Sequence, residues 1–337
     1  MPPEQPTIHD VARLAQVSTA SVSRVLSGSR PVTPEVRKRV ESAAASLNYH
    51  VNPTGRSLRV QQTGTIGLVV GNIANPFFPM LVRAVDAAAR TAGLGLLIAD
   101  AHEDPGLERQ CVQALVWRKI DALLISPCHR FLSQEIVRRA SRVVNVVQID
   151  RSALPTVDVV TVDQRAAVRL VVQHLMESGR QNLVFVGSAP SVSTSWQRQE
   201  AFVEIIRQMN PVAEPRVLSG DFSVEWGRRA GAEILSRWPE TDGVVCGDDL
   251  IALGVLQQLM EAGRSVPGEI AVTGFDDSII AEASHPALTS VRQPLDLIAE
   301  TALRLAAKPS GGDRAPQEIL LDAVLVPRAS SVSTSVR

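Results

Sequence analysis

The sequence predicts an α/β protein, with a small head of three helices followed by a two-lobed, doubly wound α/β domain. Three observations support this prediction. Residues 7–48 hold only short helical patterns separated by turn signals. From Thr65 onward, short apolar runs alternate with amphipathic helical stretches, which is typical of buried parallel strands joined by helices. The alternation comes in two series, and 337 residues are enough for two such cores and a small module.

The first two helices of the head have recognisable start signals. Thr7 precedes Asp10 by three residues, which is a capping-box pattern, and apolar residues follow at helical spacing. A turn at Gln16-Val17 leads to Ser18, a good N-cap residue for a second helix over residues 19–26. We therefore predict two short helices joined by a tight turn.

The third helix is well specified, whereas the segment after it is not. Thr33, Pro34 and an acidic first turn start a helix that runs to about Leu47. Residues 53–59 form at most a marginal helix, because they are polar and contain Gly55. We interpret residues 50–62 as a hinge or linker that orders only on binding.

The strands of the two-lobed domain are apolar runs. The first series is TIGLVV, LGLLIAD, DALLISP and VVNVVQID, and the second is VVTVD, NLVFVGS, RVLSG, DGVVCGD and EIAVTGFDD. Helical patterns lie between them. The expected divisions are 1–49 for the head, 50–62 for the hinge, 63–161 with about 292–317 for the N-terminal lobe, 162–291 with about 318–328 for the C-terminal lobe, and 329–337 for a flexible Ser-rich tail.

Basic residues are concentrated at the N-terminal end of a chain whose formal net charge is −1. Residues 1–62 contain eight basic and four acidic side chains, and the remainder contains 26 basic and 31 acidic ones. We therefore expect only the head to meet a polyanion. The three cysteines have no metal-like spacing, no apolar run is long enough to cross a membrane, and the N-terminus has no secretion signal. These features predict a cytoplasmic protein without cofactor or metal.

Two helices joined by a tight turn and braced by a third form a helix-turn-helix, which places its second helix in the major groove of DNA. The residues of that helix expected to face base edges are Thr19, Ala20, Ser21 and Arg24. Arg24 can bond guanine in a bidentate manner, and Thr19 or Ala20 can contact a thymine methyl. Ser18 and Ser23 are suited to phosphates. The alternative is an ordinary helical cap on the α/β body.

Over essentially the whole chain, the sequence resembles the LacI/GalR family of bacterial transcriptional regulators. The matching motifs are TIHDVA at 7–12, VSTASVSRVL at 17–26, LNY at 47–49, NP at 52–53, RSL at 56–58, TIG at 65–67 and NPFF at 75–78. The departures are Gln16 for the usual turn glycine, Ser27 for asparagine, Val51 for proline and Gly55 for alanine. We expect Gln16 to strain the turn, and Gly55 to make the hinge helix harder to form without DNA.

The resemblance implies that residues 53–60 form a hinge helix on DNA, with Leu58 wedged into the minor groove at the operator centre. It also adds Thr7, Asn52 and Arg56 to the DNA-binding residues. It implies a homodimer that places two heads on one pseudo-palindromic operator. Without the resemblance, Leu58 is an ordinary linker leucine.

A second candidate site lies at the carboxyl ends of the predicted strands, where open α/β sheets bind ligands. The residues at these strand-to-loop junctions are Asn75, Phe77, Phe78, Asp150, Arg151, Arg198, Phe222, Asp248, Asp276 and Gln293. Carboxylates accept from hydroxyls, Arg and Asn donate, and aromatic faces stack on sugar rings, so the set suits a neutral polyol. Each residue taken singly can equally be an N-cap, a surface turn or, for the phenylalanines, part of the core.

The α/β domain resembles periplasmic sugar-binding proteins, especially the ribose binders, which favours a ribose-like pentose as effector. Asp248 departs from that pattern, because ribose binders carry asparagine there. The change removes a donor and adds a charge, which leaves another pentose, a hexose or a nucleoside open. A purine corepressor is less favoured, because the loop at residues 188–196 lacks the extra arginine of those family members. Trp196 either lines the site or packs in the fold.

These features predict a repressor of a sugar or nucleoside utilisation operon, released from its operator when an effector closes the two lobes. The alternatives are a corepressor-dependent repressor, a secreted sugar receptor and an enzyme. The pairs Asp248-Asp249 and Asp276-Asp277 raise acid–base or metal-dependent catalysis. Because neighbouring acids diverge on a helix or turn, the second of each pair is expected to cap or brace. No nucleophile has a nearby base signature, so we do not expect an enzyme.

Overall fold

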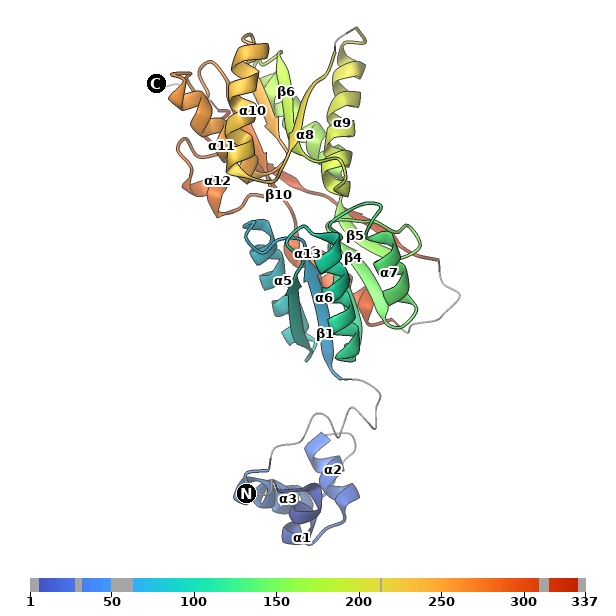
Figure 1. Cartoon of the computed structure of the whole chain (residues 1–337). Coiled ribbons are helices and arrows are strands. Elements are labelled where there is room, and N and C mark those ends of the chain that lie inside the picture. Colours follow the sequence, from blue (N-terminus) through green and yellow to red (C-terminus); the bar gives the residue numbers. More distant parts are fainter. Residues whose placement is uncertain (1–5, 28–31, 50–62, 213, 309–314, 333–337) are drawn as a thin grey trace. The chain divides into compact units, whose positions relative to one another are not determined.

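The computed structural model describes residues 6–27, 32–49, 63–212, 214–308 and 315–332 (Figure 1). The chain divides into two compact units, Met1–Thr63 and Gly64–Arg337. The first is a head that contains three helices, and the second contains two six-stranded sheets flanked by helices. This architecture confirms the predicted fold class.

The helices of the head are α1 (Ile8–Ala15), α2 (Thr19–Ser27) and α3 (Pro34–Ser46). Their start signals form as expected. The N–H and hydroxyl of Thr7 donate to Asp10 Oδ2 at 2.9 and 2.7 Å. Ser18 Oγ accepts the N–H of Ser21 at 3.2 Å, and Thr33 Oγ1 accepts a backbone N–H from the first turn of α3 at 3.5 Å. The predicted caps of all three helices are therefore confirmed.

A small aliphatic core holds the three helices together. Val11 of α1, Val22 of α2 and Val40 of α3 are completely buried in it. Burying a valine contributes about 1.5 kcal/mol or more, which matters in so small a unit. The turn between α1 and α2 has a cost, because Gln16 adopts a left-handed conformation with φ +51° and ψ +46°. The expected strain at Gln16 is thus confirmed.

The N-terminal lobe is built on a sheet with strand order β11-β5-β4-β3-β1-β2, in which all neighbours are parallel. The strands are β1 (Thr65–Val70), β2 (Gly95–Asp100), β3 (Ala122–Ile125), β4 (Asn145–Ile149), β5 (Asp158–Val162) and β11 (Glu318–Leu321). One face is covered by α5 (Phe77–Thr91) and α13 (Leu295–Ala306), and the other by α6 (Pro105–Trp117) and α7 (Gln134–Ser141). Strands β1, β3, β4 and β5 are buried almost throughout, which explains their continuous apolar sequence.

The C-terminal lobe repeats this plan with strand order β12-β10-β9-β8-β6-β7. Its strands are β6 (Leu183–Ser188), β7 (Arg216–Gly220), β8 (Gly243–Cys246), β9 (Ala271–Phe275), β10 (Thr289–Arg292) and β12 (Val324–Val326). Only β12 pairs antiparallel, with β10. Helices α8 (Gln164–Glu177) and α9 (Ser193–Met209) cover one face, α10 (Val224–Arg237) and α11 (Asp249–Glu261) the other, and α12 (Ile279–Ala283) follows β9.

The chain passes between the lobes three times, after β5, after β10 and after β11. Two sequence assignments are wrong at these crossings. The run VVTVD, placed in the second series, forms β5 of the first sheet. Glu318–Leu321, placed in the C-terminal lobe, forms β11 and pairs parallel with β5. Such a short edge strand has no signal of its own, because its partner is decided by backbone pairing between residues 159 apart, such as Glu318 and Val159.

The expected flexible tail is wrong for its first residues. Ser330 is completely buried, and its hydroxyl donates to the Val272 carbonyl at 2.6 Å and accepts the N–H of Thr289 at 2.8 Å. The Ser331 hydroxyl lies 2.6 Å from Thr289 Oγ1. These serines satisfy polar groups of β9 and β10, a role that composition alone cannot reveal. Residues 333–337 lie outside the described part of the chain.

Replacing Gln16 with glycine should stabilise the head by about 0.5–1 kcal/mol, because glycine adopts positive φ without a steric penalty. Amide hydrogen exchange of α1 and α2 in the full chain measures the change, and protection factors should rise. Ser42→Gly, at an exposed interior position of α3, is the matched control and should lower them. Equal protection in Gln16→Gly and wild type would show that the turn is not strained.

Candidate functional site

Helix α2 buries Val22 and Val25 in the head core and presents its polar residues at the surface. Ser18, Ala20 and Arg24 are exposed, and Thr19, Ser21 and Ser23 are partly exposed. Arg24 Nε donates to the Ala20 carbonyl at 3.2 Å, one turn back along the helix. An accessible helix face of small polar residues and an arginine suits a helix that enters the major groove.

The other predicted DNA-contacting residues fall into two groups. Thr7 is exposed at the start of α1, where its hydroxyl is bonded to Asp10. Asn52, Arg56 and Leu58 lie outside the described residues.

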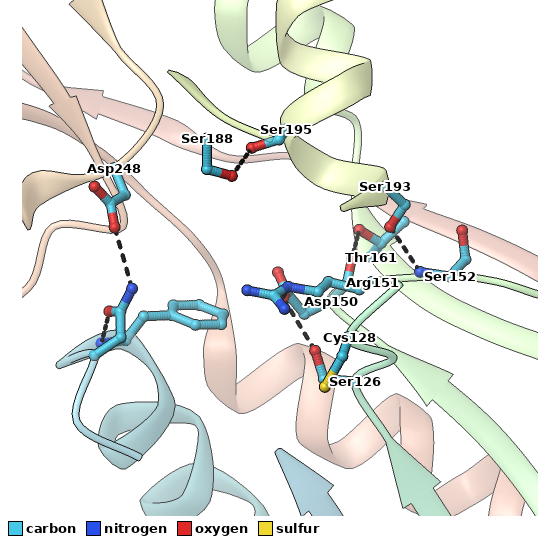
Figure 2. A network of polar contacts seen from close by, with 12 residues as sticks. Ser126, Cys128, Asp150, Arg151, Ser152, Thr161, Ser188, Ser193, Ser195 and Asp248 are labelled. Atoms are coloured by element: carbon cyan, nitrogen blue, oxygen red, sulfur yellow. Dashed lines mark hydrogen bonds and ion pairs between the residues drawn. The ribbon is translucent and has the colours of Figure 1, made fainter. Parts of the chain in front are cut away.

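The polar junction residues of the α/β domain come together where the two lobes meet. Asn75 follows β1 and Asp150-Arg151 follows β4 in the N-terminal lobe, whereas Asp248 follows β8 and Asp276 follows β9 in the C-terminal lobe. Asn75, Asp150, Arg151, Arg198, Asp248, Asp276 and Gln293 are all at most 8% exposed. Figure 2 shows Asp150 and Arg151 on one side of this region and Asp248 on the other. We call these seven residues the inter-lobe set.

A direct hydrogen bond connects the lobes within this set. Asn75 Nδ2 donates to Asp248 Oδ2 at 3.1 Å, and both side chains are buried (Figure 2). The same two side chains also begin helices, because Asn75 Oδ1 accepts the N–H of Phe77 and Asp248 Oδ1 accepts that of Ile251. Asn75 and Asp248 can therefore each cap a helix and join the lobes at the same time, because the two contacts use different atoms of the side chain.

Arg198 is the buried cation that lies beside Asp276 in the inter-lobe set. Its Nη1 donates to the Gly247 carbonyl at 2.5 Å and its Nε to Gln164 Oε1 at 2.8 Å. Its Nη2 lies 3.9 Å from Asp276 Oδ1, and its guanidinium carbon lies 3.5 Å from the centre of the Phe275 ring. Planar guanidinium groups stack on aromatic faces in this way while keeping donors free at their edge.

Asp276 and Gln293 are bonded to each other in the C-terminal lobe. Gln293 Nε2 donates to Asp276 Oδ1 at 2.7 Å, and this bond fixes both side chains. Gln293 Oε1 has no partner among the described residues. A buried acceptor without a donor is costly, so this atom is a natural contact for a ligand hydroxyl.

Arg151 forms its hydrogen-bonded ion pair with Glu103 and not with its sequence neighbour Asp150. It bonds Glu103 through two nitrogens at 2.7 and 3.0 Å, while its Nε lies 3.7 Å from Asp150 Oδ2. Its guanidinium carbon lies 5.2 Å from the Phe78 ring and 5.3 Å from the Phe222 ring, which come from opposite lobes. Arg151 therefore joins the lobes through two aromatic rings.

The three predicted phenylalanines are mainly core residues. Phe77 and Phe78 are 4% and 1% exposed and lie in the apolar cluster under α5, with their rings 5.2 Å apart. Phe222 is partly buried beside the core between α10 and α11. The core interpretation applies to Phe77, whereas Phe78 and Phe222 also touch the site through Arg151.

The electrostatics of the inter-lobe set are dominated by the burial of several carboxyl groups near one another. Loss of solvation raises the pKa of Asp150 to about 6 and that of Asp248 to about 7, and the charge on Asp276 contributes to both shifts. Burial also raises the pKa of Asp276 and lowers the pKa of Arg198. Acceptors thus outnumber cations, and hydroxyl donors from a ligand would stabilise the ionised carboxylates.

The second acid of each pair braces the fold, as expected from the sequence. Asp249 accepts from the N–H and hydroxyl of Ser278 at 2.7 and 2.8 Å and from the Ser290 hydroxyl at 2.6 Å. Asp277 pairs with Arg292 and Arg328 at 2.5 and 2.7 Å. Both carboxylates are committed to structural contacts.

Sequence reasoning missed Glu103 and Gln164, which orient the two arginines. Neither sits in a recognisable motif. One signal was available, because Gly71 directly follows the buried strand β1. A Cβ atom there would lie 2.8 Å from Arg151 Nη1 and from Glu103 Oε1, so the glycine makes room for this ion pair.

Within the described ranges, no three His, Cys, Asp or Glu side chains are placed to hold a metal ion. None of the described helices is long and apolar enough to span a membrane.

Two family models match the chain. The bacterial regulatory proteins of the lacI family match residues 7–52, and a periplasmic binding protein-like domain matches residues 172–331. The HTH-type transcriptional regulator GalR of Escherichia coli is 32% identical over 331 residues, covering 97% of this chain and 96% of GalR. The ribose operon repressor of Halalkalibacterium halodurans is 31% identical over 302 residues, covering 90% of this chain and 89% of the repressor.

Solved structures agree with these matches. A complex of the transcriptional regulator CelR with cellobiose is 29% identical, with a TM-score of 0.72, and covers 96% of this chain and 99% of CelR. The Lac repressor dimer bound to operator and the anti-inducer ONPF superposes with a TM-score of 0.86 over 98% of this chain and 100% of that chain, and at 24% identity it supports the fold alone. The relatives are regulators, which confirms the prediction that the chain is not an enzyme. With two matching family models and a regulator 32% identical over nearly its full length, the chain belongs to the LacI family of DNA-binding transcriptional regulators.

Proposed function

We propose that this regulator represses a sugar or nucleoside utilisation operon, and that a small neutral effector, first of all a ribose-like pentose, binds between the lobes and releases it from its operator. The observation that carries this proposal is the buried inter-lobe set, in which three carboxylates lie with two arginines and Gln293 Oε1 lacks a partner among the described residues. A polyol offers several hydroxyl donors without adding charge. The names of two similar proteins, the ribose operon repressor and the CelR–cellobiose complex, support the sugar class.

The proposed DNA interface is a pair of heads on one pseudo-palindromic operator, each reading a half-site with α2. Arg24 bonds guanine, Thr19 and Ala20 contact bases, and Ser18 and Ser23 hold phosphates. Thr7, Asn52 and Arg56 add backbone contacts, and Leu58 enters the minor groove.

Release follows if the effector binds the closed lobes better than the open ones. The bond between Asn75 and Asp248 joins the start of α5 to the C-terminal lobe, so closure acts directly on that helix. In the proposed homodimer, such a movement changes how the two N-terminal lobes meet. A corepressor uses the same linkage with the opposite sign.

Arg24→Ala should weaken binding to operators selected from random duplexes by about 1–3 kcal/mol and relax the preference at one base pair of each half-site. Titrations at several salt concentrations provide the measurement, since phosphate contacts make affinity salt-dependent. Arg138→Ala, an exposed arginine of α7, is the control and should leave affinity unchanged. An unaltered base preference in Arg24→Ala would place the reading contacts elsewhere.

A thermal-shift screen of pentoses, hexoses, nucleosides and purine bases, with each hit retested for operator release, tests the effector proposal. We expect a free sugar or nucleoside to raise the melting temperature and weaken operator binding. Arg198→Ala should lose both responses and still bind DNA; loss of DNA binding as well would indicate misfolding. A hit that tightens DNA binding reverses the sign of the mechanism. No hit at all contradicts the polyol assignment of the inter-lobe set.

Asp248→Asn should flatten the dependence of stability on pH. The Asp248 carboxyl has its pKa raised to about 7 by burial, so the folded protein keeps a proton that the unfolded chain loses near pH 4. The free energy of unfolding of the wild type therefore falls as pH rises between about 4 and 7. Denaturant titrations at pH 5 and pH 8 should show a fall smaller by about 1–4 kcal/mol in the variant.

The matched control is Asp104→Asn, the same substitution at the exposed N-cap of α6. It should leave the difference between pH 5 and pH 8 as in the wild type. An Asp248→Asn variant with the wild-type difference would mean that this carboxyl is not desolvated in solution.

A further inference from the structure

Resting on the effector site proposed between the lobes, we propose that Arg130 is a specificity-determining residue that clasps the lobes together at the edge of this site and limits the effector to one sugar ring. Arg130 lies in the loop between β3 and α7 of the N-terminal lobe, and its contacts in the C-terminal lobe are in the loop between β6 and α9 and in the first turn of α9. Each of these loops follows the carboxyl end of its strand.

Three contacts of Arg130 cross from one lobe to the other. Its backbone N–H donates to the Ser191 carbonyl at 2.8 Å, and its Nη1 lies 3.4 Å from the Pro190 carbonyl. Its guanidinium carbon lies 3.8 Å from the centre of the Trp196 ring, so charge and ring are in contact. The ring of Phe131 lies beside the same guanidinium, at 5.1 Å. We call Arg130 and Trp196 the clasp.

The loop that carries Arg130 is braced by its own residues. His129 Nδ1 accepts the N–H groups of Phe131 and Leu132 at 3.1 and 3.3 Å, and Gln134 Nε2 donates to the Arg130 carbonyl at 3.1 Å. All these bonds stay within the N-terminal lobe, and none needs the Arg130 side chain. The guanidinium is therefore presented by a preformed loop, which keeps the entropic cost of the clasp low.

The clasp lies at the solvent edge of the lobe interface. Trp196 is 37% exposed and Phe131 is 62% exposed. Earlier on α9, Ser193 and Ser195 are 5% and 2% exposed. Ser193 Oγ accepts the N–H of Ser152 at 2.9 Å, a second link between the lobes just inside the clasp (Figure 2).

The number of sugar rings that the effector can have depends on whether the Trp196 ring is free or covered. Aromatic faces at the edge of a sugar site are platforms for a further sugar ring. Here the guanidinium of Arg130 covers the ring, and the bond from Arg130 to Ser191 holds the loop in place. An effector with a second ring leaving the site past α9 must displace both contacts, whereas a single ring leaves them intact.

The Ser152 amide reports closure without any ligand, since it donates across the lobe interface. We expect its hydrogen exchange, resolved by mass spectrometry with electron-transfer fragmentation on the full-length protein, to speed up about 3- to 30-fold in Arg130→Ala. Trp196→Ala should give the same change, and the double variant no more than either alone. Arg138→Ala should exchange as the wild type does. Unchanged Ser152 exchange in both single variants overturns the clasp.

Calorimetric titrations with ribose, glucose, galactose, cellobiose and lactose test the ring-size limit. Wild type should bind its best one-ring sugar at least tenfold more tightly than either two-ring sugar. In Arg130→Ala that ratio should fall toward one. Two-ring sugars that bind wild type as tightly as one-ring sugars overturn the limit. If none of the five binds while Ser152 exchange still accelerates in Arg130→Ala, the clasp is supported and the proposed sugar effector is contradicted.

Discussion

Arg198 connects three segments that meet only in the folded C-terminal lobe: Gln164 at the start of α8, Gly247 after β8 and the Phe275 ring at the end of β9. Its charge is buried, so it needs carboxylates nearby, and Asp276 lies 3.9 Å away. Asp150 and Asp248 add two further carboxyl groups, whereas Arg151, 3.7 Å from Asp150, is hydrogen-bonded to Glu103. The α/β domain thus holds a group of buried charges that hydroxyl donors would stabilise.

This arrangement links ligand chemistry to conformation. The inter-lobe set is contributed by both lobes, so its desolvation is greatest when the lobes are together. A ligand that donates to these acceptors lowers the free energy of the closed state more than that of the open state. Asn75 carries the consequence further, because it bonds Asp248 and also caps α5 through the Phe77 N–H.

Asp248 is the residue at which this chain departs most from the ribose-type pattern. As an N-cap it bonds the Ile251 N–H, a role that asparagine fills equally well. The second oxygen of Asp248, Oδ2, accepts a hydrogen bond from Asn75, and it is at this atom that a carboxylate and an amide differ. Burial raises the pKa of Asp248 to about 7, and its ionised form is a stronger acceptor than an amide oxygen, which bears on which hydroxyl pattern is preferred.

Local pattern determined much of this protein from sequence alone. The capping residues Thr7, Ser18 and Thr33, the buried parallel strands and the polar residues at their ends are visible because helix and strand periods and cap chemistry act over a few residues. Only the tertiary structure decided that β11 joins the first sheet, that Ser330 is buried, that Glu103 pairs with Arg151, and that Asn75 meets Asp248. The reason is physical: these contacts join residues 41 or more apart in the chain, and backbone pairing and desolvation across such separations leave no local signature.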